Sequence, residues 1–450
     1  MKIILLLISS ILLCASPALA EKHVVGYFPA WMLDELPAED VDFDVVTNIV
    51  YAFAWPNDDG SFESYSPPAS PELIEAAHSA GRKVSISIGG GGHETGFPTI
   101  IADPSLRAAF IDSIFAFCDL YGYDGADFDW EFPQSTDQRD GYAALIRELR
   151  NAVDQSGRDF LISMAISAAS WPSFSNDVAA LNDVVDWFFV MCYDYSGPWG
   201  QTAGHQSPLY SRTDLGYSLS VSRSMEYLLE TRTLALDKIV LGIPFYGRQF
   251  NASKLFGSSS GGDALRYSVI LGEIAGETWT EEWDDKAKAP YLLNADKTKL
   301  ITYDNEESVR AKCEFALEND LAGVGIWALG YDYNESEQTL VDVIGDVMAT
   351  ETFVENDVSD STPRALVLAG NFPNPFNPST AINYSLESPA HVRLEVFTVA
   401  GQRIAVLEDD LKSSGSHRVA WNAGSMPSGI YLYRISAGGN TANGRMTLLR

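Results

Sequence analysis

The stretch Asp124-Gly125-Ala126-Asp127-Phe128-Asp129-Trp130-Glu131 carries an acidic residue at every second position from Asp127 onward. Side chains alternate between the two faces of a β-strand, so Asp127, Asp129 and Glu131 would share one face and the apolar residues between them the other. Burying three carboxyl groups in a row costs free energy unless they are hydrogen-bonded or neutralised. The pattern therefore indicates either a functional strand or an exposed edge strand with its acidic face in water.

Short apolar runs recur on both sides of this stretch and alternate with helical patterns. Most runs are continuous, which is typical of parallel strands covered on both faces. The runs are Val24–Phe28, Asn48–Phe53, Lys83–Ile88, Gly125–Trp130, Phe160–Ile166, Trp187–Tyr193, Ile239–Phe245 and Gly323–Ala328. Helical spacing occurs in Ser70–Ala80, Ser105–Leu120, Asp137–Val153, Ser218–Glu230, Glu306–Leu317 and Ser336–Val347. This alternation predicts an α/β fold, a (β/α)8 TIM barrel. The alternative, a doubly wound sheet, lacks a Gly-rich dinucleotide motif after the first strand.

In such a barrel the acidic strand is the fourth. Its carboxyl groups would line the interior and rise toward the mouth at the carboxyl ends of the strands. Because crowded carboxyl groups do not all ionise easily, we expect at least one raised pKa. Glu131, nearest to the mouth, is the predicted general acid. An ordinary retaining glycosidase also needs a carboxylate nucleophile across the sugar, and this strand offers none on the opposite side.

These motifs resemble those of a known enzyme family. The stretch 124–131 is similar to the DGxDxDxE signature of glycoside hydrolase family 18 chitinases. Further matches in the family's order are Ser87-Ile88-Gly89-Gly90, Met191-Cys192-Tyr193-Asp194, Gly242–Arg248 and Trp327. The resemblance covers about residues 22–350. It implies a secreted chitinase that hydrolyses β-1,4 bonds between N-acetylglucosamine units by substrate-assisted retaining catalysis, in which the substrate's N-acetyl oxygen is the nucleophile.

The resemblance also implies individual roles. Glu131 would be the general acid and base, Asp129 would hold the acetamido N–H, Asp127 would share a proton with Asp129, and Tyr193 would donate to the acetamido oxygen. The substrate-binding residues that it implies are Tyr27, Phe53, Gly90, Trp130, Met191, Asp194, Tyr246, Arg248 and Trp327. No cofactor and no metal is expected.

Two features depart from the family pattern. Many members carry Trp directly after SxGG, where this chain has Gly91-Gly92-His93. Stacking on a sugar there is either lost or supplied by Trp55 or Trp199. A modest insertion, Gln249–Tyr303, follows the seventh strand, and its Trp283 fits a sugar-stacking wall and the insertion's own small core equally well.

The two ends of the chain differ from the barrel region. Lys2, the apolar run Ile3–Leu13 and Ala18-Leu19-Ala20 predict a signal peptide over 1–20. An acidic linker is expected at 351–364. Turn residues then separate alternating runs, which predict an all-β sandwich over 365–450. These runs are Ala381–Leu386, Val392–Phe397, Arg403–Leu407, Arg418–Trp421, Ile430–Ile435 and Arg445–Leu449.

The C-terminal region resembles the sorting domain of the type IX secretion system. The resemblance rests on Asn371–Thr380, Val396–Arg403, Ser428–Tyr431 and the basic end Arg445–Arg450. It implies export through a bacterial outer membrane, with the type IX secretion machinery as partner of residues 365–450. A carbohydrate-binding module is the competing interpretation. Against it, most aromatic residues here fall within alternating runs, where they favour a core.

The bulk composition limits the partners. With 30 Lys and Arg against 61 Asp and Glu, the net charge of −31 argues against nucleic acid and against anionic membrane surfaces. Apart from the signal peptide, no apolar stretch is long enough to span a membrane. Without Cys14, three widely spaced cysteines remain, which is not a disulfide framework. We expect a monomer that is secreted or held at the cell surface, with chitin or N-acetylglucosamine oligosaccharides as partner.

Two other functions stay open at this stage. One is a related family 18 hydrolase, an endo-β-N-acetylglucosaminidase or a peptidoglycan hydrolase. The other is a non-catalytic chitin-binding lectin. Lectin-like members typically lose the terminal glutamate, and this chain keeps Glu131.

Overall fold

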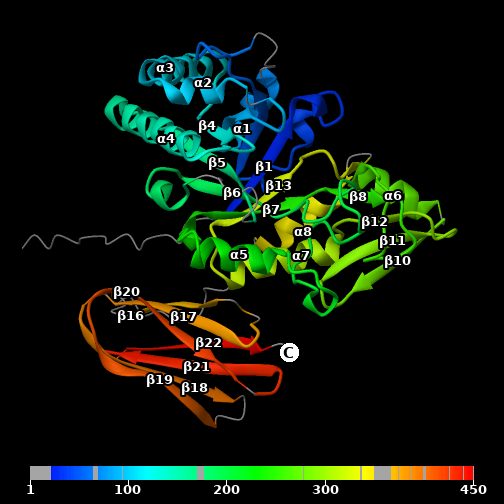
Figure 1. Ribbon diagram of the computed structural model, residues 1–450. Helices are drawn as coiled ribbons and strands as arrows, with labels where there is room; N and C mark the ends of the chain where they lie inside the picture. Colours follow the sequence, from blue (N-terminus) through cyan, green and yellow to red (C-terminus); the bar gives the residue numbers. More distant parts are fainter. Residues whose placement is uncertain are drawn as a thin grey trace, which may run out of the picture.

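The computed structural model describes residues 22–63, 69–93, 95–169, 177–276, 278–334, 337–348 and 366–448, the last range with gaps at 373, 375, 387, 399–401, 425 and 439. The expected signal peptide at 1–20 and the expected linker at 351–364 lie outside the described residues. Figure 1 shows a barrel with surrounding helices, and below it a separate β-sandwich formed by the end of the chain.

Eight parallel strands close into a barrel in the order β1-β13-β7-β6-β5-β4-β3-β2. They are β1 His23–Pro29, β2 Asn48–Ala54, β3 Lys83–Gly89, β4 Gly125–Asp129, β5 Leu161–Ser167, β6 Trp187–Met191, β7 Ile239–Pro244 and β13 Gly323–Trp327. Each predicted apolar run overlaps one of these strands. The predicted α/β class and (β/α)8 barrel are confirmed, and the acidic strand lies inside the closed barrel rather than at an edge.

Helices surround the barrel where helical spacing predicted them. They are α1 Pro71–Ser79, α3 Pro104–Tyr121, α4 Thr136–Ser156, α5 Val221–Glu230, α7 Glu306–Glu318 and α8 Thr339–Met348. Side chains of Ser70, Asp103, Ser135, Ser220 and Asn305 accept hydrogen bonds from the first-turn amides of α1, α3, α4, α5 and α7. These caps explain where the helices begin, because first-turn amides have no partner within the helix.

Some connections differ from the simple alternation. The short helix α2, Phe97–Ala102, precedes α3 and was not predicted. Between β1 and β2 the chain forms only the 3-10 turns η1 Ala30–Met32 and η2 Ala38–Asp40. Further 3-10 turns are η3 Ala179–Leu181, η4 Thr213–Leu215 and η5 Leu236–Lys238. Segments of six residues or fewer carry too little periodicity to be recognised from sequence.

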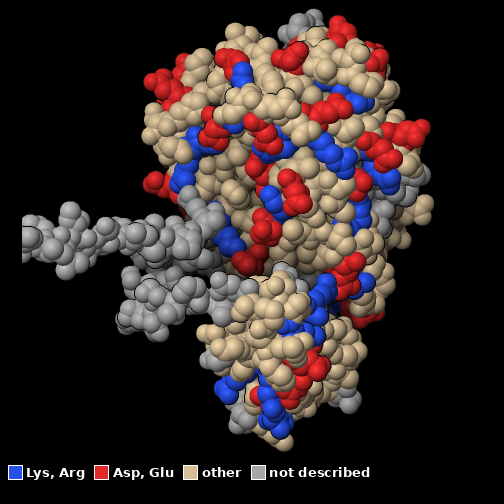
Figure 2. Space-filling model, turned by 90° about the vertical axis from the view of Figure 1, so that its left-hand side faces the viewer, with Lys and Arg blue, Asp and Glu red and all other residues tan. Residues whose placement is uncertain are grey.

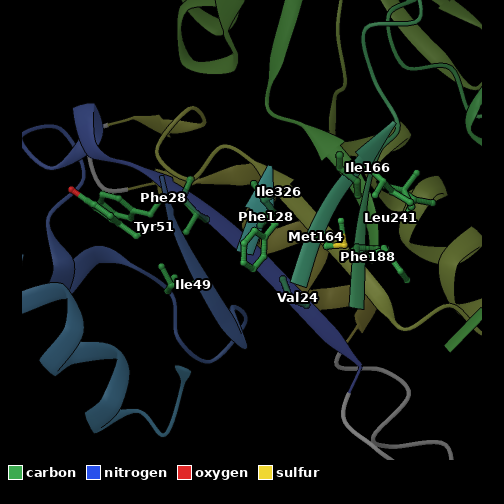
Figure 3. Packing of buried hydrophobic residues seen from close by; sticks show 14 of the residues in the cluster. Val24, Phe28, Ile49, Tyr51, Phe128, Met164, Ile166, Phe188, Leu241 and Ile326 are labelled. Carbon is green, nitrogen blue, oxygen red and sulfur yellow. The ribbon is translucent and has the colours of Figure 1, made fainter. Parts of the chain in front are cut away.

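Two apolar layers hold the barrel together. Outward-facing strand residues such as Phe128, Met164 and Ile326 pack under the helices in the larger cluster, part of which is seen in Figure 3. A smaller cluster with Tyr27, Trp187 and Phe189 fills the barrel interior. The outer layer is apolar along every strand, whereas the inward faces carry buried polar residues, among them Ser87 of β3, Asp127 and Asp129 of β4 and Ser163 of β5.

The insertion after β7 forms its own antiparallel sheet, in the order β10-β11-β12-β8-β9. Its elements are β8 Tyr246–Phe250, β9 Ala264–Arg266, α6 Tyr267–Ala275, β10 Trp279–Asp284, β11 Ala289–Asn294 and β12 Leu300–Thr302. Trp283 is half-buried on the edge strand β10, three strand positions from β8. At about 4.8 Å per strand this is roughly 14 Å. Both interpretations of Trp283, the sugar-stacking wall and the insertion's own core, stay predictions.

The C-terminal region is a β-sandwich of a three-stranded sheet, β16-β17-β20, and a four-stranded sheet, β19-β18-β21-β22. The strands are β16 Leu366–Phe372, β17 Ser379–Leu386, β18 Ala390–Thr398, β19 Arg403–Lys412, β20 Gly415–Asn422, β21 Gly429–Ala437 and β22 Asn440–Leu448. Only β16 was not predicted. The aromatic side chains of Tyr384, Trp421, Tyr431 and Tyr433 are buried in the core of the sandwich, as expected.

Short hairpins complete the elements, with β14 Tyr333–Asn334 paired to β15 Glu337–Gln338. In the described part of the chain, no helix is long and apolar enough to cross a membrane. Cys118, Cys192 and Cys313 are all buried as free thiols, so the expectation of no disulfide framework holds for these three. Acidic and basic side chains are interspersed on the face shown in Figure 2.

One buried carboxyl group links β13 to α8. Asp332 follows β13, is fully buried, and accepts hydrogen bonds from the amides of Leu340 at 3.0 Å and Val341 at 3.2 Å. Burial raises the pKa of Asp332 to about 7, although these two amides act in the opposite direction. The unfolded-state pKa is about 3.9. The folded protein therefore holds this proton more tightly than the unfolded chain, and stability falls as the pH rises from about 4 to 7.

We predict that Asp332→Asn removes this part of the pH dependence. The cost in the wild type is of order 4 kcal/mol above pH 7 and absent near pH 4. The melting temperature of the variant minus that of the wild type should therefore increase from pH 4.5 to about pH 7 and level off above it, as followed by calorimetry. Asp296→Asn, at an exposed residue between β11 and β12, is the control, and its difference should change less with pH than that of Asp332→Asn. A flat difference for Asp332→Asn would contradict the assignment.

Candidate active site

The acidic face of β4 opens at the barrel mouth, where several strands end together. Asp127 and Asp129 are buried with exposed fractions of 0% and 4%, whereas Glu131 is exposed just beyond the strand. Phe53 and Trp327 lie at the corresponding ends of β2 and β13. The predicted rise of the three acidic residues from interior to mouth is therefore what the structure shows.

Asp127 is held by three hydroxyl groups from three other strands. Its Oδ2 accepts from Tyr27 of β1 at 2.9 Å and from Ser87 of β3 at 2.8 Å, and its Oδ1 accepts from Ser163 of β5 at 2.7 Å. Burial raises the pKa of Asp127, and the three hydroxyl donors act against that rise. A buried carboxyl group with a raised pKa can hold a proton that an exposed one would lose.

The sequence suggested that crowding among the carboxyl groups would raise at least one pKa, with Glu131 keeping the proton. In the structure the pKa of Asp127 is raised, and its largest cause is burial. The role of Glu131 as the protonated acid stays a prediction. Asp127 lies deepest in the barrel, and Glu131 is exposed at the mouth.

The backbone of Gly89 and Gly90 passes against this strand. The amide of Gly90 donates to the carbonyl of Asp129 at 2.8 Å, and both glycines have positive φ, 113° and 88°. A Cβ at Gly89 would lie 2.4 Å from that carbonyl oxygen, and one at Gly90 would lie 2.9 Å from the ring of Phe53. Glycine is thus required at both positions of SxGG, because Asp129 and Phe53 lie too close for a Cβ and because the backbone is left-handed there.

Aromatic rings line the floor of the mouth. Phe53 stacks with Trp327 at a centroid distance of 5.8 Å, and the ring of Tyr27 lies 5.7 Å from Trp327 and 4.6 Å from Phe189. The indole of Trp327 is partly exposed, so it offers a surface on which an apolar sugar face can stack.

The end of β6 brings a phenol and an ion pair to the same place. Burial raises the pKa of Tyr193, with smaller contributions from Tyr246 and from the nearby charges of Asp129 and Glu131. The phenol therefore stays protonated and can donate a hydrogen bond. Next to it, Arg248 forms two parallel hydrogen bonds to Asp194, at 2.8 and 2.7 Å.

Most of the predicted site residues meet at this mouth, but two take different places. Trp130 is 4% exposed, and its ring stacks on Phe97 of α2 at 5.3 Å and meets Tyr142 of α4 edge-on at 5.2 Å. It faces the helix layer, because it alternates with the acidic residues, so we remove it from the substrate contacts. Tyr27 is 1% exposed and lies beneath the floor, where its hydroxyl serves Asp127.

The sequence interpretation missed Ser163 and Trp31 near the mouth, and it named Ser87 only as part of SxGG. Ser87 and Ser163 hold Asp127, and the signal was a polar residue inside an otherwise apolar strand. Trp31 is 49% exposed with its ring centroid 6.5 Å from that of Trp327, and Trp199 is 62% exposed with Arg248 over its ring at 4.9 Å. Trp199 had been considered only as a replacement stacking residue.

The departure after SxGG also has a structural counterpart. A Cβ built on Gly91 would lie 3.4 Å from Oε1 of Glu131, so the position that follows SxGG borders the acidic residue directly. The ring of Trp55 stacks at 4.4 Å on His93, which belongs to the same segment. Among the described residues, no group of His, Cys, Asp and Glu is arranged to hold a metal ion.

Comparisons with known proteins agree with this geometry. The family model Glycosyl hydrolases family 18 matches residues 23–332, and the model Secretion system C-terminal sorting domain matches residues 371–448. Among curated proteins, Probable chitinase 2 of Drosophila melanogaster is 30% identical over 360 residues, covering 70% of this chain and 73% of the relative. Chitinase A1 of Niallia circulans is 28% identical over 290 residues, covering 57% of this chain and 41% of the relative.

Solved structures show the same fold. The Group IV chitinase of Ostrinia furnacalis in complex with allosamidin has a TM-score of 0.67 at 26% identity, covering 73% of this chain and 99% of that one. The family 18 chitinase of Cycas revoluta in complex with (GlcNAc)3 has a TM-score of 0.65 at 26% identity, covering 72% of this chain and 99% of that one.

We predict that Gly90→Ala destabilises the protein by about 1–3 kcal/mol more than Gly81→Ala does. Both glycines have positive φ, but a Cβ at Gly81 meets nothing within 4 Å, whereas one at Gly90 meets the ring of Phe53. The difference between the two variants in the free energy of unfolding, measured by urea denaturation, isolates this contact. Equal losses in both variants would show that Phe53 moves aside without cost.

Proposed function

We propose, since the chain belongs to family 18 of the glycosyl hydrolases, that it hydrolyses β-1,4 bonds between N-acetylglucosamine units in chitin. The observation that carries the proposal is the acidic face of β4, with Asp127 and Asp129 buried in the barrel and Glu131 exposed at its mouth. The relatives named above are chitinases, which supports chitin as the substrate.

In the proposed reaction Glu131 is the general acid and base. It protonates the glycosidic oxygen, and the carbonyl oxygen of the substrate's own acetamido group attacks the anomeric carbon to give an oxazolinium ion. Glu131 then takes a proton from the water that opens this ion, so the anomeric configuration is retained. This route accounts for the absence, on β4, of a second carboxylate facing the sugar from the opposite side.

The neighbouring groups act on the acetamido group. Asp129 accepts its N–H and stabilises the positive charge, while Asp127 below exchanges a proton with Asp129 as that charge develops and decays. Tyr193 donates to the acetamido oxygen, because its raised pKa keeps the phenol protonated. Substrates without an N-acetyl group lack the internal nucleophile and should not react.

The sugar itself is held by aromatic and polar side chains around these groups. Trp327 is the proposed stacking floor under the reacting unit, bordered by Phe53 and Gly90. Met191, Asp194, Tyr246 and Arg248 form the opposite wall, since β6 ends and β8 begins there. Trp31 and Trp199 extend this surface on two sides with exposed indoles.

The remaining regions fit export of the enzyme. We propose a signal peptide at 1–20, the catalytic domain at 21–350, a linker at 351–364 and the sorting domain at 365–450, which the secretion machinery recognises. The match to a secretion sorting domain supports passage to the cell surface or beyond it. We propose that the secreted enzyme acts as a monomer without a cofactor.

We predict that Glu131→Gln lowers kcat on N-acetylglucosamine hexamer by about 10²–10⁴-fold with little change in melting temperature. The side chain is exposed, so the amide removes the transferable proton without disturbing the core. Glu75→Gln, an exposed glutamate on α1, is the matched control and should retain full activity. Time-resolved product analysis of the hexamer measures both variants; undiminished activity in Glu131→Gln would contradict the proposed role.

A substrate panel tests the choice of chitin. Wild-type protein should cleave chitin oligomers at least tenfold faster than peptidoglycan fragments or N-linked glycans, which are the substrates of the related hydrolases. Binding of chitin oligomers without turnover would point to a lectin instead. Faster cleavage of either other substrate would replace chitin in the proposal and leave the acid–base role of Glu131 in place.

A further inference from the structure

A buried ion pair lies behind the loop that carries Tyr193. Lys312 of α7 and Asp304, which follows β12, have side chains with no solvent exposure. The ammonium group donates to both carboxylate oxygens of Asp304, at 2.7 and 2.6 Å, and Ser308 donates to the same carboxylate at 2.6 Å. A charged pair with all its partners satisfied in the core is costly to build, and a structural role alone does not require it.

The pair continues through one hydroxyl to the end of β6. Lys312 also donates to the hydroxyl oxygen of Ser207 at 2.6 Å, and Ser207 donates to the backbone carbonyl of Cys192 at 2.6 Å. An ammonium group can only donate, so the hydroxyl proton of Ser207 must point away from it, toward Cys192. The ion pair therefore sets the direction of this last hydrogen bond.

The carbonyl of Cys192 belongs to the peptide bond that leads into Tyr193. The next residue, Asp194, has a φ of 58°, a left-handed backbone that costs a non-glycine residue free energy unless its surroundings hold it. On the far side of this turn, the amide of Tyr195 donates to the carbonyl of Gln206 at 2.9 Å. Gln206 and Ser207 are neighbours in one loop, and their hydrogen bonds therefore hold the turn on both sides.

We propose that Lys312 and Asp304 are positioning residues for Tyr193, acting through Ser207 on the carbonyl of Cys192. The ion pair holds the turn in the strained backbone that points the phenol toward Asp129 and Glu131. This inference rests on the proposed role of Tyr193 as donor to the acetamido oxygen. It assigns a part in the reaction to three residues outside the barrel mouth, on α7, on the end of the insertion and on the loop before α5.

The test is a double-mutant cycle between Ser207→Ala and Tyr193→Phe. Ser207→Ala should lower kcat on the hexamer about tenfold with KM changed less than twofold, because one hydrogen bond that orients the donor is lost. In the Tyr193→Phe background, where there is no phenol to orient, the same substitution should cost less than twofold. Equal fold losses in both backgrounds would overturn the proposal and leave Ser207 a purely structural residue.

Two further variants separate the ion pair from the hydroxyl. Lys312→Met together with Asp304→Leu replaces the pair with apolar side chains and leaves no uncompensated charge, so the protein should fold. It should lower kcat by several-fold in the wild-type background only; unchanged kcat would overturn the role of the pair. Ser222→Ala removes another buried hydroxyl, on α5 and 3.2 Å from Ser220, and should leave kcat unchanged.

A readout without substrate keeps the inference distinct from the proposed function. In Ser207→Ala, amide hydrogen exchange in a peptide covering residues 191–196 should rise at least tenfold, with no change in peptides from α3. If the wild type does not cleave chitin oligomers, the proposed function fails, and this exchange still decides whether the network holds the turn. Unchanged exchange would overturn the inference whatever the substrate is.

Discussion

Most of the barrel mouth depends on one buried carboxyl group. Asp127 has no contact with solvent, and hydroxyl groups from β1, β3 and β5 reach it at 2.7–2.9 Å. These bonds tie four of the eight strands together at one level of the barrel. They also fix the orientation of β4, whose acidic face must point into the barrel. Asp129 and Glu131 therefore lie toward the mouth, and Trp130 points into the helix layer. Both the acidic site and the packing of Trp130 follow from the alternation of side chains along this strand.

The sequence predicted those parts of the structure in which apolar residues follow a recognisable pattern along the chain. Continuous apolar runs predicted the eight strands, helical spacing predicted six helices, and alternation on β4 predicted which side chains face inward. The family resemblance suggested Trp130 as a sugar contact, whereas in the structure the same alternation turns its ring into the helix layer. Side-chain contacts between different strands could not be predicted from such patterns. Ser87 and Ser163 are distant from Asp127 in sequence, and only closure of the barrel brings them together.

Which charged side chains are buried was also harder to predict from the sequence than which residues belong to the site. The acidic run predicted at least one raised pKa through crowding, and the pKa of Asp127 is raised with burial as the largest cause. Lys312 looks like a surface residue of an amphipathic helix in the sequence, yet its side chain has no solvent exposure. Its partners come from Asp304, which follows β12, and from Ser207 in the loop after β6. Only the folded chain brings these two residues to α7.

The three thiols of the described chain have a practical consequence. Cys118, Cys192 and Cys313 are at most 1% exposed, and burial raises the pKa of all three, to about 12 for Cys192 and Cys313. Thiols of this kind are poor nucleophiles at neutral pH and do not exchange readily. The described fold can thus be produced in a reducing host without an oxidative refolding step, and reducing agents added during chitin processing should leave it intact.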